Sequence, residues 1–414
     1  MRRAGFAPGS GPNDRPAASW GFPVLAALLV AASACGDRAP SDPSAEIQID
    51  TLPNGVIHVS NPAQGLWAPG EEWRLVEELR IGSVEGDGPE VFGGTIPDLE
   101  VDGMGRIWVA DSQSREVRIF GPDGEHIRTL GGEGEGPGEF RSLSRIVEGA
   151  DGTFSVVDPS LARHTVFDSS GALVETRSGE RGGSLPGPLG GVDREGRVFE
   201  AFSELDGEGV VEYLIRSDGG LTPVDTFPLP FRQDLLTRIS QPGTGFFGAP
   251  VLYGHRRVSA VTADHHVWTA YTDAFRLAHL TPEGDTLRIV EKAWIPEPLP
   301  GELRTILDEG FSNLEEEQIT AYAETLPEER APFREFRVDD EGRLWIPPHG
   351  DFFTSPWDRF HVFDAEGRYL GVAEADPPLS GGGPVRFRGG RAYAIVLDEL
   401  DVPYVVRYRI EGVP

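Results

Sequence analysis

The nine histidines are candidate functional residues, because imidazole serves in proteins both as a metal ligand and as a general acid or base. They are His58, His126, His164, His255, His265, His266, His279, His349 and His361. No pair has the H-E-x-x-H spacing of a zinc protease. Adjacent His265 and His266 would point to opposite faces of a strand, so we expect structural or solvated histidines. The sequence also lacks the G-x-S-x-G pattern of an esterase nucleophile.

Two aspartates, Asp111 and Asp158, end matching strand-like segments that lie 47 residues apart. We expect their carboxylates to cap the following turns by accepting hydrogen bonds from backbone N–H groups. The alternative is that such carboxylates form a ring that binds a ligand or a hard cation such as Ca²⁺. No other cofactor is indicated.

A third candidate site is the segment His349–Phe353, which interrupts one of the strand-rich units described below. Polar and aromatic side chains together in such a loop can meet a ligand. His349 and Asp351 are therefore candidate ligand-binding residues.

The only cysteine, Cys35, follows a secretory signal. Arg2, Arg3 and Arg15 precede the apolar run Phe22–Ala32, which is too short to span a bilayer. The segment Ala32–Gly36 resembles a bacterial lipobox, although Ala32 stands where that pattern usually has Leu. The resemblance predicts a signal peptide over residues 1–34, a lipid on Cys35 and a flexible tether over residues 35–50. The other interpretation is ordinary cleavage that leaves a free thiol.

The elements that position these residues are repeats. Gly105–Asp111 (GRIWVAD) matches Gly152–Asp158 (GTFSVVD) at an offset of 47 residues, and Phe120 and Phe167 match at the same offset. Each unit indicates strands joined by Asp-Gly or Glu-Gly turns, and roughly 45 residues suit one four-stranded propeller blade.

Four looser copies follow, beginning near residues 193, 263, 338 and 387, which makes six units. The last unit ends soon after its third strand. Because a closed ring leaves fewer exposed strand edges, an upstream segment must supply the missing outer strand. Trp73–Ile81 is the predicted segment.

The glycine-rich segment Gly131–Phe140, together with Val109–Asp111, resembles the signature of NHL-repeat propellers. The wider resemblance, over about residues 70–410, is to bacterial six-bladed, TolB-like propeller lipoproteins. This resemblance implies an all-β fold: a six-bladed β-propeller over residues 51–414, with a helical insertion at about 296–330 between blades four and five.

Two insertions are predicted. Apolar spacing indicates one helix over Glu302–Glu309 and a second that begins at a capping box, Ser312–Glu315, and ends before Pro327. These helices form either a surface decoration or a lid over the channel. The other insertion, Phe227–Pro250, lacks the residues of a phosphate loop and is expected to be a mobile rim loop.

The composition limits the possible partners. The 414 residues are 39% hydrophobic, which suffices for a core, and the net charge of −30 repels nucleic acid. We expect an exported monomer that reaches a membrane only through its lipid, on the periplasmic or cell-surface side. We expect it to bind a protein, peptide or glycan without catalysis. The alternative is a metal-assisted hydrolase or lyase with its site in the central channel.

Overall fold

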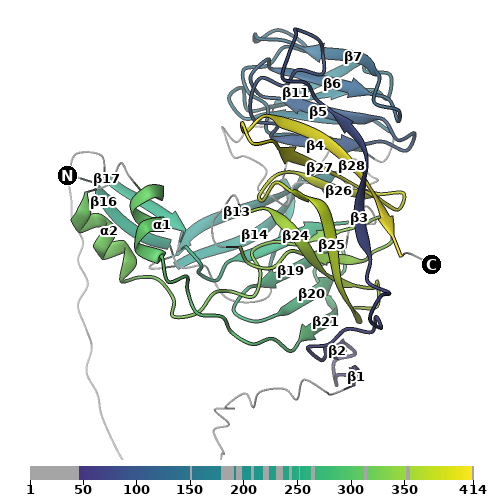
Figure 1. Cartoon of the computed structure of the whole chain (residues 1–414). Helices are drawn as coiled ribbons and strands as arrows, with labels where there is room; N and C mark the ends of the chain where they lie inside the picture. The colour runs from purple at the N-terminus through teal and green to yellow at the C-terminus, as the bar shows by residue number, and fades with distance from the viewer. Residues whose placement is uncertain are drawn as a thin grey trace, which may run out of the picture. The chain divides into compact units, whose positions relative to one another are not determined.

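The computed structural model describes residues 46–149, 152–178, 191–192, 198–206, 209–217, 223–229, 236–241, 245–250, 252–262, 266–311, 315–350 and 355–412. Its described elements are β-strands and two short helices (Figure 1). The signal peptide and Cys35 lie outside the described residues. No helix among the described residues is long and apolar enough to cross a membrane.

The two strongest repeats form the first two four-stranded antiparallel sheets. The first contains β4 (Asp98–Val101), β5 (Ile107–Asp111), β6 (Glu116–Phe120) and β7 (His126–Gly131). The second contains β8 (Arg145–Glu148), β9 (Phe154–Asp158), β10 (Arg163–Phe167) and β11 (Leu173–Ser178). The repeated heptapeptides end in β5 and β9, as their spacing predicts.

The third and fourth blades follow the same order. Blade three contains β12 (Gly191–Val192), β13 (Val198–Asp206), β14 (Gly209–Ser217) and β15 (Pro223–Pro228). Blade four contains β18 (Arg257–Val261), β19 (Val267–Tyr271), β20 (Arg276–Leu280) and β21 (Thr286–Lys292).

Two N-terminal strands, β1 (Gln48–Thr51) and β2 (Ile57–Asn61), extend blade four at its outer edge. β2 pairs in parallel with β21, and the Asn61 side chain donates to the carbonyls of Glu291 and Gly367. The last residues of the segment predicted as a tether, 35–50, lie in this sheet, because β1 begins at Gln48.

Blades five and six share one eight-stranded sheet. Blade five contains β22 (Arg337–Val338), β23 (Leu344–Ile346), β24 (Trp357–Phe363) and β25 (Tyr369–Leu379). Blade six contains β26 (Val385–Arg388), β27 (Arg391–Leu397) and β28 (Pro403–Glu411).

The fourth strand of blade six is β3 (Arg74–Ile81), which pairs antiparallel with β28. In Figure 1 the purple β3 runs beside the yellow β28. This confirms the prediction that Trp73–Ile81 completes the last blade. β3 also pairs in parallel with β25, so it joins blades five and six.

Apolar side chains bury the faces between neighbouring blades. Trp108 stacks on Phe154 between blades one and two, with ring centroids 4.0 Å apart, and Trp345 stacks on Phe387 between blades five and six at 4.4 Å. Other clusters join blades three and four, four and five, and six and one. Between blades two and three the innermost strands β8 and β12 are in contact. The chain is a six-bladed β-propeller.

Two insertions interrupt the blades. The segment expected to be a rim loop instead contains the hairpin of β16 (Leu236–Gln241) and β17 (Gly245–Pro250), so that expectation is wrong. Each strand is six residues long, and every residue of β16 pairs with a residue of β17. The residues of a loop would have no such backbone pairing.

The helical insertion between β21 and β22 is confirmed as α1 (Leu303–Gly310) and α2 (Glu316–Ala323). α2 begins later than predicted, because Glu315 rather than Ser312 is its N-cap. The Glu315 N–H donates to the Gln318 side chain at 2.9 Å. α2 also contacts β16, so the two insertions lie together.

Candidate functional site

A cavity of about 410 Å³ lies among the segments that introduce blades four, five and six. Pockets of this size accommodate small ligands or the end of a larger one. Its lining residues are Arg256, Arg334, Glu335, Pro347, Pro348, Gly350, Ser355, Trp357, Gly381 and Gly382. They come from the residue before β18, the approach to β22, the β23–β24 connection, the first residue of β24 and the β25–β26 turn.

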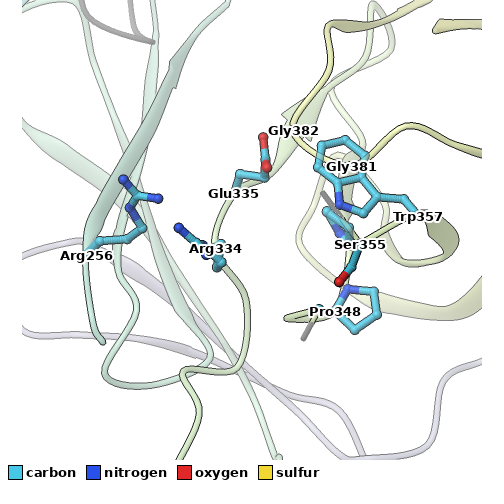
Figure 2. Close-up of a pocket in the computed structure, with 10 residues that line it drawn as sticks. Arg256, Arg334, Glu335, Pro348, Ser355, Trp357, Gly381 and Gly382 are labelled. Atoms are coloured by element: carbon cyan, nitrogen blue, oxygen red, sulfur yellow. The ribbon is translucent and has the colours of Figure 1, made fainter. Parts of the chain in front are cut away.

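Two arginines give the pocket its charge. Figure 2 shows Arg256 and Arg334 on one side of it, with Pro348, Ser355 and Trp357 on the other. The backbone N–H of Arg256 donates to the Thr272 hydroxyl at 2.9 Å, which fixes the start of β18. Among the described residues no carboxylate lies within ion-pair distance of the Arg256 guanidinium. The one acidic side chain of the lining, Glu335, pairs with Arg337 at 2.8 Å.

Burial, with a smaller contribution from the nearby charge of Arg256, lowers the pKa of Arg334 to about 10. Arg334 therefore remains charged at neutral pH. A cation held beside another cation, partly out of water, is stabilised by an anion brought between them. The electrostatics of the pocket favour a negatively charged ligand group.

His349, predicted as a ligand-binding residue, lies between two lining residues in the chain, Pro348 and Gly350. The residue is only 9% exposed, and its Nδ1–H donates to the Gly350 carbonyl at 2.9 Å. Burial, with smaller contributions from Arg334 and other arginines, lowers the pKa of His349 to about 3. The imidazole is neutral at physiological pH, and its depressed pKa reports a positive potential around the pocket.

The helical insertion packs against the segment that precedes Arg256. The Leu252 N–H donates to the Tyr322 hydroxyl of α2 at 2.8 Å, and both residues belong to a buried apolar cluster with Tyr253. The Tyr253 ring in turn lies 5.5 Å from the His349 ring, centroid to centroid. Packing of α2 therefore supports the segment that leads into Arg256.

The wall formed by the β25–β26 turn is made of backbone. A Cβ atom on Gly381 would lie 1.9 Å from the Ser355 carbonyl oxygen, so only glycine permits this approach. Gly382 has a φ of +74°, which glycine also adopts readily. Trp357 is buried beneath this wall, with the Arg337 guanidinium 5.5 Å from its ring centroid.

The predicted turn-capping role of Asp111 and Asp158 is confirmed. Asp111 accepts hydrogen bonds from the Gln113 and Ser114 N–H groups and pairs with Arg118 at 3.1 Å. Asp158 accepts from the backbone N–H groups of Arg141 and Leu161 at 2.8 and 3.1 Å. Their alternative role as ligand-binding residues stays a prediction.

Three carboxylates lie on the innermost strands that the structure describes, those of Asp98, Glu100 and Glu148, and each is paired with an arginine. The Arg386 guanidinium contacts Asp98 at 2.8 Å and Glu100 at 3.0 Å, and Arg388 pairs with Glu148. Burial disfavours the charge on Arg386, but the two carboxylates outweigh that effect and raise its pKa. Burial raises the pKa of Glu100. These strands hold a neutralised ionic network.

No three or more His, Cys, Asp or Glu side chains come together as a potential metal site within the part of the chain that the structure describes. Asp351, like Cys35, lies outside that part.

The sequence located the pocket only through His349. Arg256 and Arg334 were missed because single arginines in an arginine-rich chain carry no spacing signal. The available signal was the position of Arg334, which follows directly after a long insertion in the sequence.

Comparison with known proteins supports the fold. A family described as "6-bladed beta-propeller" matches residues 92–177. A Bacteroides fragilis protein thought to be exported has 11% identity and a TM-score of 0.50 over 86% of this chain and 99% of its own. Virginiamycin B lyase from Staphylococcus aureus has 10% identity and a TM-score of 0.44, over 82% and 99%. No curated protein sequence matches this chain.

Proposed function

We propose that this protein is an exported, membrane-tethered propeller that binds a protein, peptide or glycan without converting it. Its ligand site is the pocket between Arg334 and Trp357. The observation that carries the proposal is the cavity itself, in which two arginines face a glycine-rich wall. Propellers suit binding because connections from several blades meet at one place.

Two features favour binding over acid–base chemistry in this pocket. His349 has a pKa of about 3, so it does not take up a proton near neutral pH as a general base should. The described carboxylates of the innermost strands pair with Arg386 and Arg388, so these carboxylates are not open to a cation as a channel hydrolase would require.

Site-specific photo-crosslinking in intact cells tests the proposal. Benzoylphenylalanine placed at Ser355, in the lining, is expected to capture a partner. The same group at Ile127, which is 48% exposed on β7, serves as the control and is expected to capture none. Equal adducts from both positions, or none from Ser355, would refute the pocket as the binding site.

The tether is proposed separately, from the lipobox-like segment that ends in Cys35. Cys35→Ala is expected to move the protein from the membrane fraction to the soluble fraction, because a lipid chain supplies the binding energy for a membrane. Continued sedimentation of the variant with membranes would show that Cys35 is not the anchor.

A further inference from the structure

We infer that the ligand presents the free carboxylate at the end of a peptide to Arg256 and Arg334. This inference rests on the proposed function and names the class of ligand that the pocket takes. It is argued from the charge of the lining and from the chemistry of the opposite wall.

The charge argument starts from the protein as a whole. The chain carries a net charge of −30, and most described arginines near the surface pair with a carboxylate, as Arg80 does with Glu77 and Arg368 with Asp364. Arg256 and Arg334 lie on the same side of the pocket, close enough that the charge of Arg256 contributes to lowering the pKa of Arg334. Two guanidinium groups side by side in one pocket of so acidic a protein create a local positive potential, which favours an anionic group of a ligand.

The geometry favours a carboxylate over a more highly charged anion. A guanidinium group forms two parallel hydrogen bonds with a planar carboxylate. Glu335 also lines the pocket and, although paired with Arg337, adds negative charge. A dianion such as phosphate would meet more repulsion there than a monoanion.

The opposite wall favours a peptide. Gly350, Gly381 and Gly382 bring backbone atoms to the surface of the cavity, where they can pair with the N–H and C=O groups of an extended chain. Trp357 is only 7% exposed, so it offers no open ring face on which a sugar could stack. The pocket thus combines two arginines that can bind an anion with an opposite wall that presents backbone atoms.

Titration calorimetry with the purified protein tests the inference. The probes are N-acetyl-trialanine with its free carboxylate, the same peptide as its C-terminal amide, glucuronate and inorganic phosphate. The free acid is expected to bind, and the amide about tenfold more weakly or worse, because it cannot form the charged pair. Added salt should weaken binding of the acid but not of the amide.

Variants complete the experiment. Arg256→Gln is expected to weaken binding of the acid about tenfold and to leave binding of the amide unchanged. Arg359→Gln, at an arginine that is 60% exposed on blade five and paired with Asp358, is the matched control and should change neither. The salt comparison on the unaltered protein keeps the test decisive if Arg256→Gln does not fold.

The outcomes separate this inference from the proposed function. Equal binding of acid and amide would overturn the carboxylate assignment and leave the pocket as a binding site. Tighter binding of glucuronate or phosphate than of the peptide acid would overturn the peptide assignment. Absence of binding by every probe would overturn the inference, while crosslinking from Ser355 would still decide the proposed function.

Discussion

Arg386 on β26 and Asp98 on β4 lie 288 residues apart in sequence, yet their side chains are 2.8 Å apart. The other carboxylate oxygen of Asp98 accepts the Ile146 N–H of β8 at 3.0 Å. One aspartate therefore connects blades six, one and two. Apolar packing buries the faces between blades, and this ionic contact fixes their innermost strands.

Arg386→Met tests the importance of this contact for stability. The substitution leaves Asp98 and Glu100 with unpaired charges in a largely buried position, and the expected loss is about 3 kcal/mol in the free energy of unfolding. The control is Arg409→Met, which breaks an exposed pair with Glu411 and should cost less than about 1 kcal/mol. Equal urea midpoints for the two variants would contradict this account.

Leu75→Ala tests the strand that completes blade six. Leu75 is fully buried on β3, in the cluster that joins blades five and six, so the cavity should cost about 2–4 kcal/mol in urea unfolding. Leu66, which is 56% exposed, provides the matched Leu→Ala control with little expected effect. Deletion of Trp73–Ile81 should be more severe, and unchanged thermal unfolding of that deletion would show that another strand completes the blade.

Acid should destabilise the protein through its buried histidines. Burial, with a contribution from Arg177, lowers the pKa of His164 to about 4, whereas an unfolded histidine titrates near 6.5. Stability is therefore fully present above about pH 6.5 and is lost as pH falls toward 4, because only the unfolded state gains the proton. The loss from His164 should reach about 2 kcal/mol at pH 5.

The comparison of urea unfolding at pH 7 and pH 5, for the unaltered protein and His164→Gln, measures that contribution. The variant should lose less stability between the two pH values. An identical loss in both proteins would mean that His164 titrates in the folded state as it does in the unfolded state, so that burial does not lower its pKa.

Lys292, the sole lysine, should react as an unusually acidic amine. Burial lowers its pKa to about 8, and its Nζ lies 4.7 Å from the centre of the Tyr369 ring and 5.3 Å from that of Phe275. Its rate of acylation by acetic anhydride, followed by mass spectrometry of the Lys292 peptide, should level off above about pH 9. A rate that rises through pH 10, as for N-acetyl-lysine amide in the same buffer, would contradict this pKa.

Much of the fold could be predicted because repeats leave a direct signature. The matched segments ending at Asp111 and Asp158 fixed the blade pattern, and the incomplete last unit identified β3. The extension of blade four by β1 and β2 could not be predicted, because parallel pairing of β2 with β21 leaves no local pattern in either segment. The hairpin within residues 227–250 was missed because its glycines and prolines also suit a loop.

The site was less predictable than the fold. His349 stood out as a polar residue in an interrupted blade, and it borders the pocket. Arg256 and Arg334 are 78 positions apart by their numbering, and only the packing of two blades and an insertion brings them to one cavity. The sequence alone does not show that these two arginines line the same cavity.

The most direct test of the central claim compares crosslinking from Ser355 in the unaltered protein and in the double variant Arg256→Gln, Arg334→Gln. Both proteins would be produced in cells and checked for equal abundance and thermal unfolding. The account predicts that the captured partner disappears from the double variant. The same adduct at the same yield in both proteins would contradict it.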